Sequence, residues 1–461
     1  MSYRDDPAAV REFPPPGARP HPPAARRIVI ISASMGAGHD GAAAELERRL
    51  LSCGFQVDRH DFLDLIPARL GTLLSSGYHR LLTWAPTGYQ RIYTRTEETR
   101  RPGPAVRALL RSAERGTLRA VTADTVAVVS TYPGASQVLG ALRRRGTVSV
   151  PAITYLTDFS VHALWVAPGI DLHLAAHPIP AGQARAQGAA GVVECGPVVD
   201  PLFAPATTAG RRAARHRFGL PEQAPLALLV AGSWGMGSIE RAAAEIRDSG
   251  VAVPVVVCGR NGALADRLRA QGIEHVHGWV RDMPGLMRAC DVLVQNAGGL
   301  TCLEAFASGL PVASYRCIPG HGQTNAAALH EAGLATWIRE PAALALRLAE
   351  LLDGPLGGQQ RARGMVLFGP DRDPVLAVAA AAGHRTGAAA TVRHPPGRPP
   401  GQSTERPSGR PVRRTGRLRV SVIATVVATT VMLGIGAPLA EAYGDSPARF
   451  GAFAHFFEGN R

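Results

Sequence analysis

The stretch RRIVIISASMGAGHDGAAAELERRL, residues 26–50, sets the fold class of the chain. Its β-branched run at 28–31 is typical of a buried parallel strand, and the glycines Gly36 and Gly38 allow a tight turn. The alanines and leucines at 42–50 predict an amphipathic helix. Strand, glycine loop and helix together leave free N–H groups facing an anion or a reacting group. His39 stands in that loop, where it either caps the helix or takes part in a reaction.

The same alternation of strand and helix recurs along most of the 461 residues, a length that suits two or three domains. In the first half, residues 26–205, strands are predicted at 28–31, 125–130, 150–158, 171–177 and 191–197. In the second half, residues 206–385, they are predicted at 225–233, 253–260, 275–280, 291–299 and 310–315. We therefore expect an α/β protein with two Rossmann-like, doubly wound domains facing a cleft, and ligands at the carboxyl ends of the strands.

The two ends of the chain differ in composition from these domains. Residues 1–25 are rich in proline and charge, which predicts a disordered tail without a signal peptide, and residues 386–418 predict a Pro/Arg-rich linker. The uncharged run within 419–441 predicts one transmembrane helix, and the preceding arginines place its N-terminal side in the cytoplasm. Residues 442–461 form a short tail. Cleavage after Ala442, next to small residues, is an open alternative to a stable anchor.

The net charge of +14 leaves nucleic acid or anionic lipid as partners, but no zinc-finger, RNP or helix-turn-helix signature favours nucleic acid. The six cysteines lack C-x-x-C spacing and suit a reducing cytoplasm. Residues 62–95 combine arginines with aromatic residues, as expected of a helix at an anionic bilayer surface. A helical pair packed on the first domain is the alternative. The predicted membrane contacts are Arg80, Trp84, Tyr89 and Arg91.

The second half contains three loops suited to a nucleotide-linked sugar. The first, at 230–246, is glycine-rich, offers Gly232, Ser233 and Gly237 to a diphosphate and lacks the G-K-[ST] of a Walker loop. In the second, Gly298 and Gly299 permit close approach of the backbone to a ligand, and Thr301 begins a helix. Glu304 either accepts hydrogen bonds from a ribose diol or is only an acidic residue in the first helical turn, where the helix dipole stabilises it. The third, at 319–325, suits a sugar's hydroxyl groups.

These motifs, in this order, resemble the monogalactosyldiacylglycerol synthase family, which includes bacterial processive diacylglycerol glucosyltransferases. The resemblance covers roughly residues 27–350 and rests on GAGH (36–39), TDFSVHALWV (157–166), GPVVDPLF (196–203), GSWGMGSIE (232–240), CGRN (258–261), GWVRDMPGLMRACDVLV (278–294) and AGGLTCLEAFASGLP (297–311). It implies a GT-B glycosyltransferase that is inverting and needs no bound metal or other cofactor. Its donor would be a UDP-sugar and its acceptor the hydroxyl group of a membrane lipid.

Carried over by motif, the resemblance implies that His39 activates the acceptor hydroxyl, and that Asp158 orients His39 or lines the acceptor site. A neutral imidazole can take such a proton near pH 7. The backbone at Trp279 and Val280 would contact uracil, and Glu304 the ribose. The third loop departs from the family: its usual Gln-Glu pair before the asparagine matched by Asn325 is replaced by His321 and Gly322, with Gln323 one position later.

The sequence therefore predicts an inverting transferase that moves a hexose or N-acetylhexosamine from a UDP-sugar to a membrane lipid, foremost diacylglycerol, at the cytoplasmic face of the membrane. Transfer to a polyprenyl-linked saccharide or a small natural product stays open as an alternative. So do a membrane-tethered UDP-sugar-binding protein without activity and an epimerase of related fold.

Overall fold

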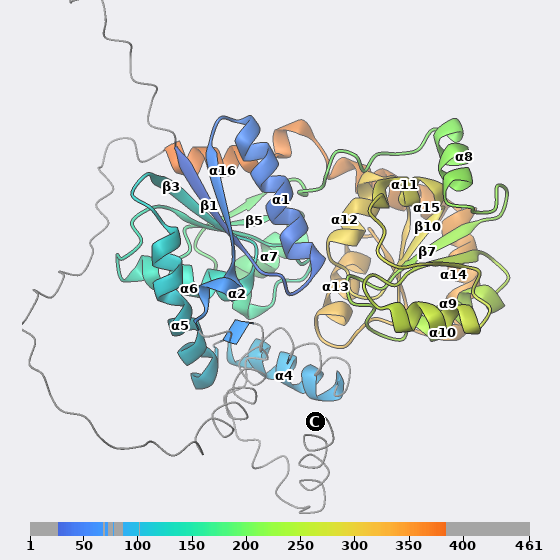
Figure 1. Ribbon diagram of the computed structural model, residues 1–461, viewed down its shortest axis with the longest axis horizontal. Coiled ribbons are helices and arrows are strands. Elements are labelled where there is room, and N and C mark those ends of the chain that lie inside the picture. Colours follow the sequence, from blue (N-terminus) through green and yellow to red (C-terminus); the bar gives the residue numbers. More distant parts are fainter. Residues whose placement is uncertain (1–25, 68–69, 72–76, 78–85, 101, 384–461) are drawn as a thin grey trace, which may run out of the picture.

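The computed structural model describes residues 26–67, 70–71, 77, 86–100 and 102–383. Within them, two six-stranded parallel sheets lie side by side, each covered by helices (Figure 1). The predicted pair of Rossmann-like domains is thus confirmed. The predicted tail at 1–25, the linker at 386–418, the transmembrane helix at 419–441 and the final tail at 442–461 lie outside the described residues. In the part of the chain that is described, no helix has both the length and the apolar character to cross a membrane.

The N-terminal sheet has the strand order β2-β1-β3-β4-β5-β6. Its strands are β1 (Arg27–Ser32), β2 (Gln56–Asp61), β3 (Thr125–Ser130), β4 (Ala152–Tyr155), β5 (Leu172–Ala175) and β6 (Val192–Glu194). The helices of this domain are α1 (Ala37–Ser52), α2 (Phe62–Leu65), α4 (Pro86–Thr99), α5 (Pro104–Ala120), α6 (Pro133–Arg144), the 3-10 turn η1 (Ala163–Trp165) and α7 (Pro178–Ala186).

The C-terminal sheet has the order β12-β11-β10-β7-β8-β9, the arrangement of a dinucleotide-binding domain. Its strands are β7 (Leu226–Val230), β8 (Val253–Val257), β9 (His275–His277), β10 (Val292–Gln295), β11 (Val312–Tyr315) and β12 (Thr336–Ile338). Its helices are α8 (Thr208–Arg217), α9 (Ile239–Asp248), α10 (Gly262–Ala270), α11 (Met283–Ala289), α12 (Leu300–Ala307), α13 (His321–Glu331), η2 (Pro341–Ala343), α14 (Leu344–Leu352), α15 (Pro355–Val366) and η3 (Pro370–Arg372).

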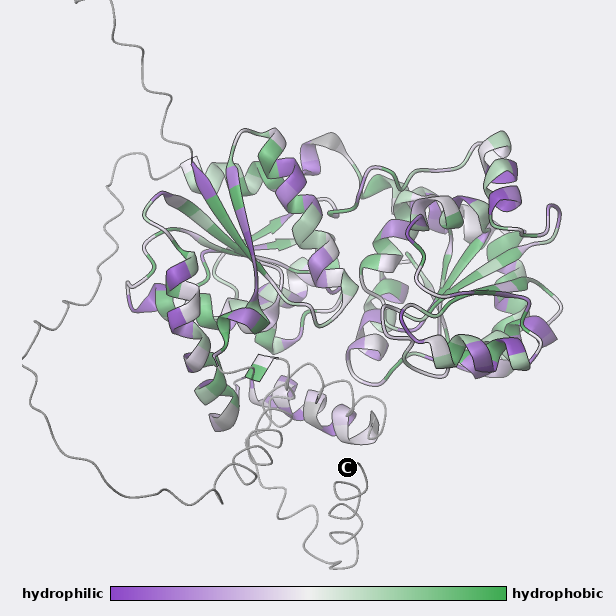
Figure 2. Ribbon diagram, in the orientation of Figure 1, coloured by the Kyte–Doolittle hydropathy of each residue, from purple (hydrophilic) through white to green (hydrophobic). Residues whose placement is uncertain are grey.

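The central strands are buried on both faces, as their apolar runs predict. The four residues at 28–31 of β1 have no exposed surface, and Figure 2 shows hydrophobic residues along the strands of both sheets. Two strands, β2 and β12, escaped prediction. Strand β2 reads QVDRHD and is half-exposed at the sheet edge, so it lacks the apolar run of a buried strand. Strand β12 has three residues and forms one edge of the C-terminal sheet.

The last described helix, α16 (Pro374–Gly383), returns to the N-terminal domain, although the sequence assigned residues 206–385 to the second domain. Val375, Val378 and Ala382 are buried with residues of β1, β3 and α1 in one core cluster. The apolar sequence of α16 predicts a buried helix but does not determine which sheet it packs against. The domain boundary is corrected accordingly, because burial against the first sheet removes these side chains from water.

In each sheet the strand order reverses at one point, between β1 and β3 in the first and between β7 and β10 in the second. Loops that leave neighbouring strands in opposite directions open a crevice there, at the carboxyl ends of the strands. His39 lies in the first turn of α1, which follows the loop after β1, and the loops after β7 and β10 contain the predicted donor glycines. Both crevices thus contain motifs predicted from the sequence.

Candidate active site

The glycine loop of the N-terminal domain lies against that of the C-terminal domain. A Cβ on Gly38, in the first turn of α1, would lie 3.7 Å from Cβ of Leu300 at the start of α12, and one on Gly41 would overlap the Leu300 side chain. Gly36, just before α1, has an extended backbone and open space around it. The small residues of α1 therefore let the two helix N-termini approach each other.

His39 is held by the carboxyl ends of two neighbouring strands. Its Nδ1 lies 2.8 Å from the carbonyl oxygen of Thr131, after β3, and 2.9 Å from Oγ1 of Thr157, after β4. Since a carbonyl oxygen only accepts, we infer that Nδ1 carries the hydrogen. In the neutral ring, Nε2 then has a free lone pair, which is the state that a general base requires.

Aromatic rings surround this imidazole. The centroid of Tyr132 lies 5.5 Å from that of His39, and the centroid of Trp165 lies 5.9 Å away. The indole Nε1 of Trp165 donates to Oδ2 of Asp158 at 3.0 Å. The contacts at Nδ1 of His39 come from Thr131 and Thr157, and the orienting role of Asp158, one of the two roles predicted for it, stays a prediction.

A pocket between the domains brings Asp158 next to the second of the three loops predicted to bind a nucleotide-linked sugar. We call the first two of these loops, after β7 and β10, the first and second donor loops. Thr157 and Asp158 line it from the N-terminal domain, and Gly298 and Gly299 line it from the C-terminal domain. This position fits the other role predicted for Asp158, as a residue of the acceptor site, and that role remains a prediction.

The first donor loop depends on glycine conformations. Gly232 and Gly237, between β7 and α9, have φ angles of +68° and +94°, which other residues rarely adopt. Asn296 Nδ2 donates to the carbonyl oxygen of Met236 at 2.8 Å and so links this loop to the loop after β10. The Ser233 carbonyl accepts from the backbone N–H of Arg260. These bonds fix a loop whose N–H groups stand at the crevice.

The second donor loop leads into α12. Gly298 has a φ of +72°, Gly299 caps the helix, and Thr301 lies half-buried in the first turn. Glu304, one turn further, is also half-buried, and burial raises its pKa to about 7, with a smaller contribution from the charge of Asp200. A carboxyl group with this pKa changes its charge at neutral pH.

Trp279, predicted to lie at the uracil, is 51% exposed. The Arg260 guanidinium lies 4.9 Å from the centroid of its ring and 5.9 Å from that of Trp234, within range of cation–π attraction. Val280, the next residue, is half-buried against the domain core. The Arg260 contact could not be predicted from the sequence, because it depends on two aromatic rings from separate loops.

The third loop meets the N-terminal domain, and it is shorter than the predicted 319–325, because α13 already begins at His321. Gln323 is exposed, whereas Asn325 is fully buried: its Oδ1 accepts from the Ser160 N–H at 2.7 Å and its Nδ2 donates to the Ala297 carbonyl at 3.0 Å. In this arrangement the Asn325 amide joins the two domains. Nδ1 of His321 lies 3.0 Å from the hydroxyl group of Tyr89.

The four residues predicted to contact the membrane have different outcomes. Arg80 and Trp84 lie outside the described residues. Arg91 is exposed on α4. Tyr89 is 7% exposed and packs against the C-terminal domain, so the structure places it between the domains and not toward a bilayer. An aromatic residue next to arginines suits either environment, and only the packing distinguishes the two.

The sequence analysis missed Thr131 and Tyr132, which contact His39. A signal was present: STYPG, residues 130–134, follows a buried strand as the His39 loop does. Because β3 is the neighbour of β1 at the reversal of strand order, the loops after both strands meet at one edge.

Comparison with known proteins agrees with this arrangement. The family model for monogalactosyldiacylglycerol synthase matches residues 39–199, and that for glycosyl transferases group 1 matches residues 233–354. A processive diacylglycerol beta-glucosyltransferase of Bacillus mycoides is 29% identical over 245 residues, which cover 49% of this chain and 59% of the relative. That of Bacillus subtilis is 29% identical over 217 residues, covering 45% and 56%. The chain thus spans little more than half the length of these relatives.

Solved structures share the two-domain fold at low identity. MurG of Acinetobacter baumannii aligns with a TM-score of 0.51 and 15% identity, over 77% of this chain and 99% of its own. Sucrose-phosphate synthase of Thermosynechococcus elongatus aligns with the same score and identity, over 77% and 98%. The resemblance that the motifs predicted is confirmed: residues 39–199 match the monogalactosyldiacylglycerol synthase family.

Proposed function

We propose that this protein is an inverting glycosyltransferase that moves a hexose from a UDP-sugar to the hydroxyl group of a membrane lipid, foremost diacylglycerol. The observation that carries the proposal is the His39 imidazole, which is hydrogen-bonded at Nδ1 to Thr131 and stands where two glycine loops from different domains meet. The names of the relatives from Bacillus support the lipid acceptor.

The residues of the cleft suit each part of this reaction. The unprotonated Nε2 of His39 accepts the proton of the attacking hydroxyl group. Glycine N–H groups at 232–237 and the N-terminus of α12 face the negative charge that develops on the leaving diphosphate. Because these donors are fixed before the reaction, the loops supply charge stabilisation from the backbone, and we propose no resident metal or other cofactor. Glu304 and the backbone at Trp279 and Val280 would hold the nucleoside.

The proposed location is the cytoplasmic face of the membrane. The uncharged run within 419–441 and the exposed arginine Arg91 on α4 support it. A single membrane pass near the C-terminus would keep the cleft near its lipid acceptor.

Transfer from radiolabelled UDP-glucose, UDP-galactose or UDP-N-acetylglucosamine to diacylglycerol in vesicles tests the proposal, with thin-layer separation of the products. The His39→Ala variant is expected to lower kcat by about 10²- to 10⁴-fold, the range of general base catalysis, and to leave the affinity for UDP unchanged. An active variant would remove His39 from this role, and no transfer by the wild type to any lipid would overturn the function.

A further inference from the structure

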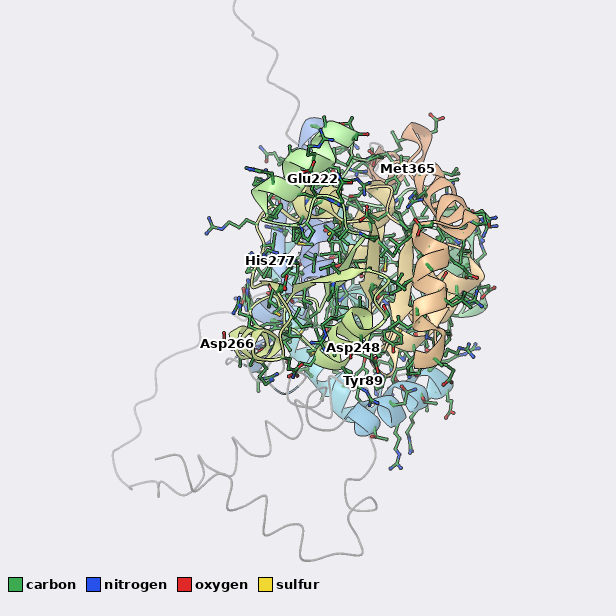
Figure 3. All side chains as sticks on the ribbon, turned by 90° about the vertical axis from the view of Figure 1, so that its right-hand side faces the viewer. Tyr89, Glu222, Asp248, Asp266, His277 and Met365 are labelled. Carbon is green, nitrogen blue, oxygen red and sulfur yellow. The ribbon has the colours of Figure 1, made fainter. Side chains whose placement is uncertain are left out.

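Helix α4 of the N-terminal domain holds the third loop of the C-terminal domain. The Tyr89 hydroxyl contacts Nδ1 of His321, and Oε1 of Gln90 accepts from the backbone N–H of Gly320. In Figure 3, Tyr89 lies on α4 at the lower side of the molecule, where this helix runs beneath the C-terminal domain. These contacts join residues more than 200 positions apart in the sequence.

The packing between α4 and this loop leaves no room for a larger residue. Gly320 has a φ of +70°, and a Cβ there would lie 2.6 Å from Cε1 of Tyr89 and 3.1 Å from Cγ of Tyr93. The Tyr93 hydroxyl contacts Oγ1 of Thr324 at 3.1 Å. The aromatic face of α4 therefore fixes the loop that precedes α13, and the loop conformation depends on both domains.

The hydrogen bond from Tyr89 sets the state of the His321 ring. Burial holds the pKa of His321 below its ordinary value, so the ring is neutral at pH 7. A phenol donates more strongly than a neutral imidazole, so we assign the Tyr89 hydroxyl as the donor to Nδ1. The remaining hydrogen of the ring is then on Nε2, which is a donor.

His321 also lies close to the cleft that contains the candidate base His39. Thr324 and Asn325, close to His321 on α13, are hydrogen-bonded to Ser160 of the N-terminal domain, two residues after Asp158. Burial has the largest effect on the pKa of His321, and the charges of Asp158 and His39 have smaller ones. Both groups come from the opposite domain, so His321 approaches the acceptor side from the donor side. A neutral N–H donor at this place can bind a hydroxyl oxygen of the sugar that is transferred.

We propose that Tyr89 is a positioning residue of the donor-sugar site, which holds His321 so that its Nε2–H donates to a hydroxyl oxygen of the hexose. The sugar site is then completed by the N-terminal domain, and selection of the sugar depends on contacts across the domain boundary. This inference rests on the proposed function, since it requires a UDP-hexose as ligand.

Calorimetric titration of the full chain with UDP and, separately, with UDP-glucose, UDP-galactose and UDP-N-acetylglucosamine tests it without an acceptor. Tyr89→Phe and His321→Ala are each expected to weaken binding of the preferred UDP-hexose by about 2- to 12-fold, the loss of one hydrogen bond, and to leave UDP binding unchanged. His321→Gln, which keeps an amide N–H, is expected to recover part of the affinity. Tyr89→Phe added to His321→Ala should cause no further loss, because Tyr89 acts through His321.

Tyr93→Phe is the matched control, because it removes a hydroxyl group from the same helix that contacts Thr324 and not His321. Its effect should be the same with and without His321. The inference is overturned if Tyr89→Phe weakens the His321→Ala variant as much as the wild type, or if UDP binding falls as much as UDP-hexose binding. Wild-type protein that binds neither UDP nor a UDP-hexose would instead overturn the proposed function and, with it, this inference.

Discussion

Glu304 offers a quantitative test of the nucleotide site through its charge. Burial raises the pKa of this carboxyl group from an ordinary value of 4.5 to about 7, and the nearby charge of Asp200 adds to the effect. A carboxyl group whose pKa is higher in the folded than in the unfolded protein binds its proton more tightly when folded. Its contribution to stability is therefore fully present below pH 4.5 and is lost as the pH rises to about 7.

The magnitude follows from the pKa difference. At 1.36 kcal/mol per pKa unit, charging Glu304 lowers the free energy of unfolding by at most about 3.4 kcal/mol. Part of the residue remains in contact with water, so we expect about 1–2 kcal/mol. The Glu304→Gln variant cannot ionise and avoids this loss. It should match the wild type at about pH 4, below the ordinary pKa of 4.5, and exceed its stability by about 1–2 kcal/mol at pH 8.

Urea denaturation followed by fluorescence at about pH 4 and at pH 8 measures this difference. Glu331→Gln, an amide substitution at an exposed position on α13, controls for the general effect of removing a carboxylate. A stability difference between Glu304→Gln and the wild type that stays constant with pH would refute the assigned burial effect. The same variant should also weaken UDP binding at pH 8, because an amide replaces the carboxylate that we propose as the acceptor for the ribose diol.

Two further substitutions test contacts around the cleft, and a third tests a buried ion pair of the C-terminal domain. Thr157→Val removes one of the two Nδ1 partners of His39 and should lower kcat about 2- to 12-fold with unchanged UDP affinity. An unchanged kcat would mean that Thr131 alone orients the His39 ring. Asn325→Ala leaves buried groups of both domains without a partner and should lower the free energy of unfolding by about 1–3 kcal/mol in urea, whereas wild-type stability would contradict a joining role. Arg215→Ala removes a buried guanidinium that donates to Asp291 at 2.7 Å and to the Ala289 carbonyl. It should cost about 1–3 kcal/mol in the same assay, because Asp291 keeps its ion pair with Arg211, and wild-type stability would contradict this estimate.

The site was predictable where one local segment carries its chemistry. The glycine loops after β1, β7 and β10 follow apolar strands directly, so the sequence placed them at the carboxyl ends of two sheets. Their helices begin within a few residues, and in the loops after β7 and β10 glycines with positive φ make the turn. His39 was found in this way because it follows the loop after β1 directly, in the first turn of α1.

The partners of these residues were decided by contacts between distant segments. His39 meets Thr131 across 92 residues, and Tyr89 meets His321 across 232. The sequence predicted a membrane contact for Tyr89 because an aromatic residue among arginines fits a bilayer surface as well as a protein interface.

The sequence by itself determined the two parallel sheets, because buried β-branched runs that alternate with amphipathic helices have few other ways to leave water. Only the tertiary structure decided which residues orient His39, where α16 packs and how α4 meets the third loop. The physical reason is that burial patterns specify a face to be covered but not the element that covers it. That choice is made by the shape and hydrogen bonding of segments brought together by the whole fold.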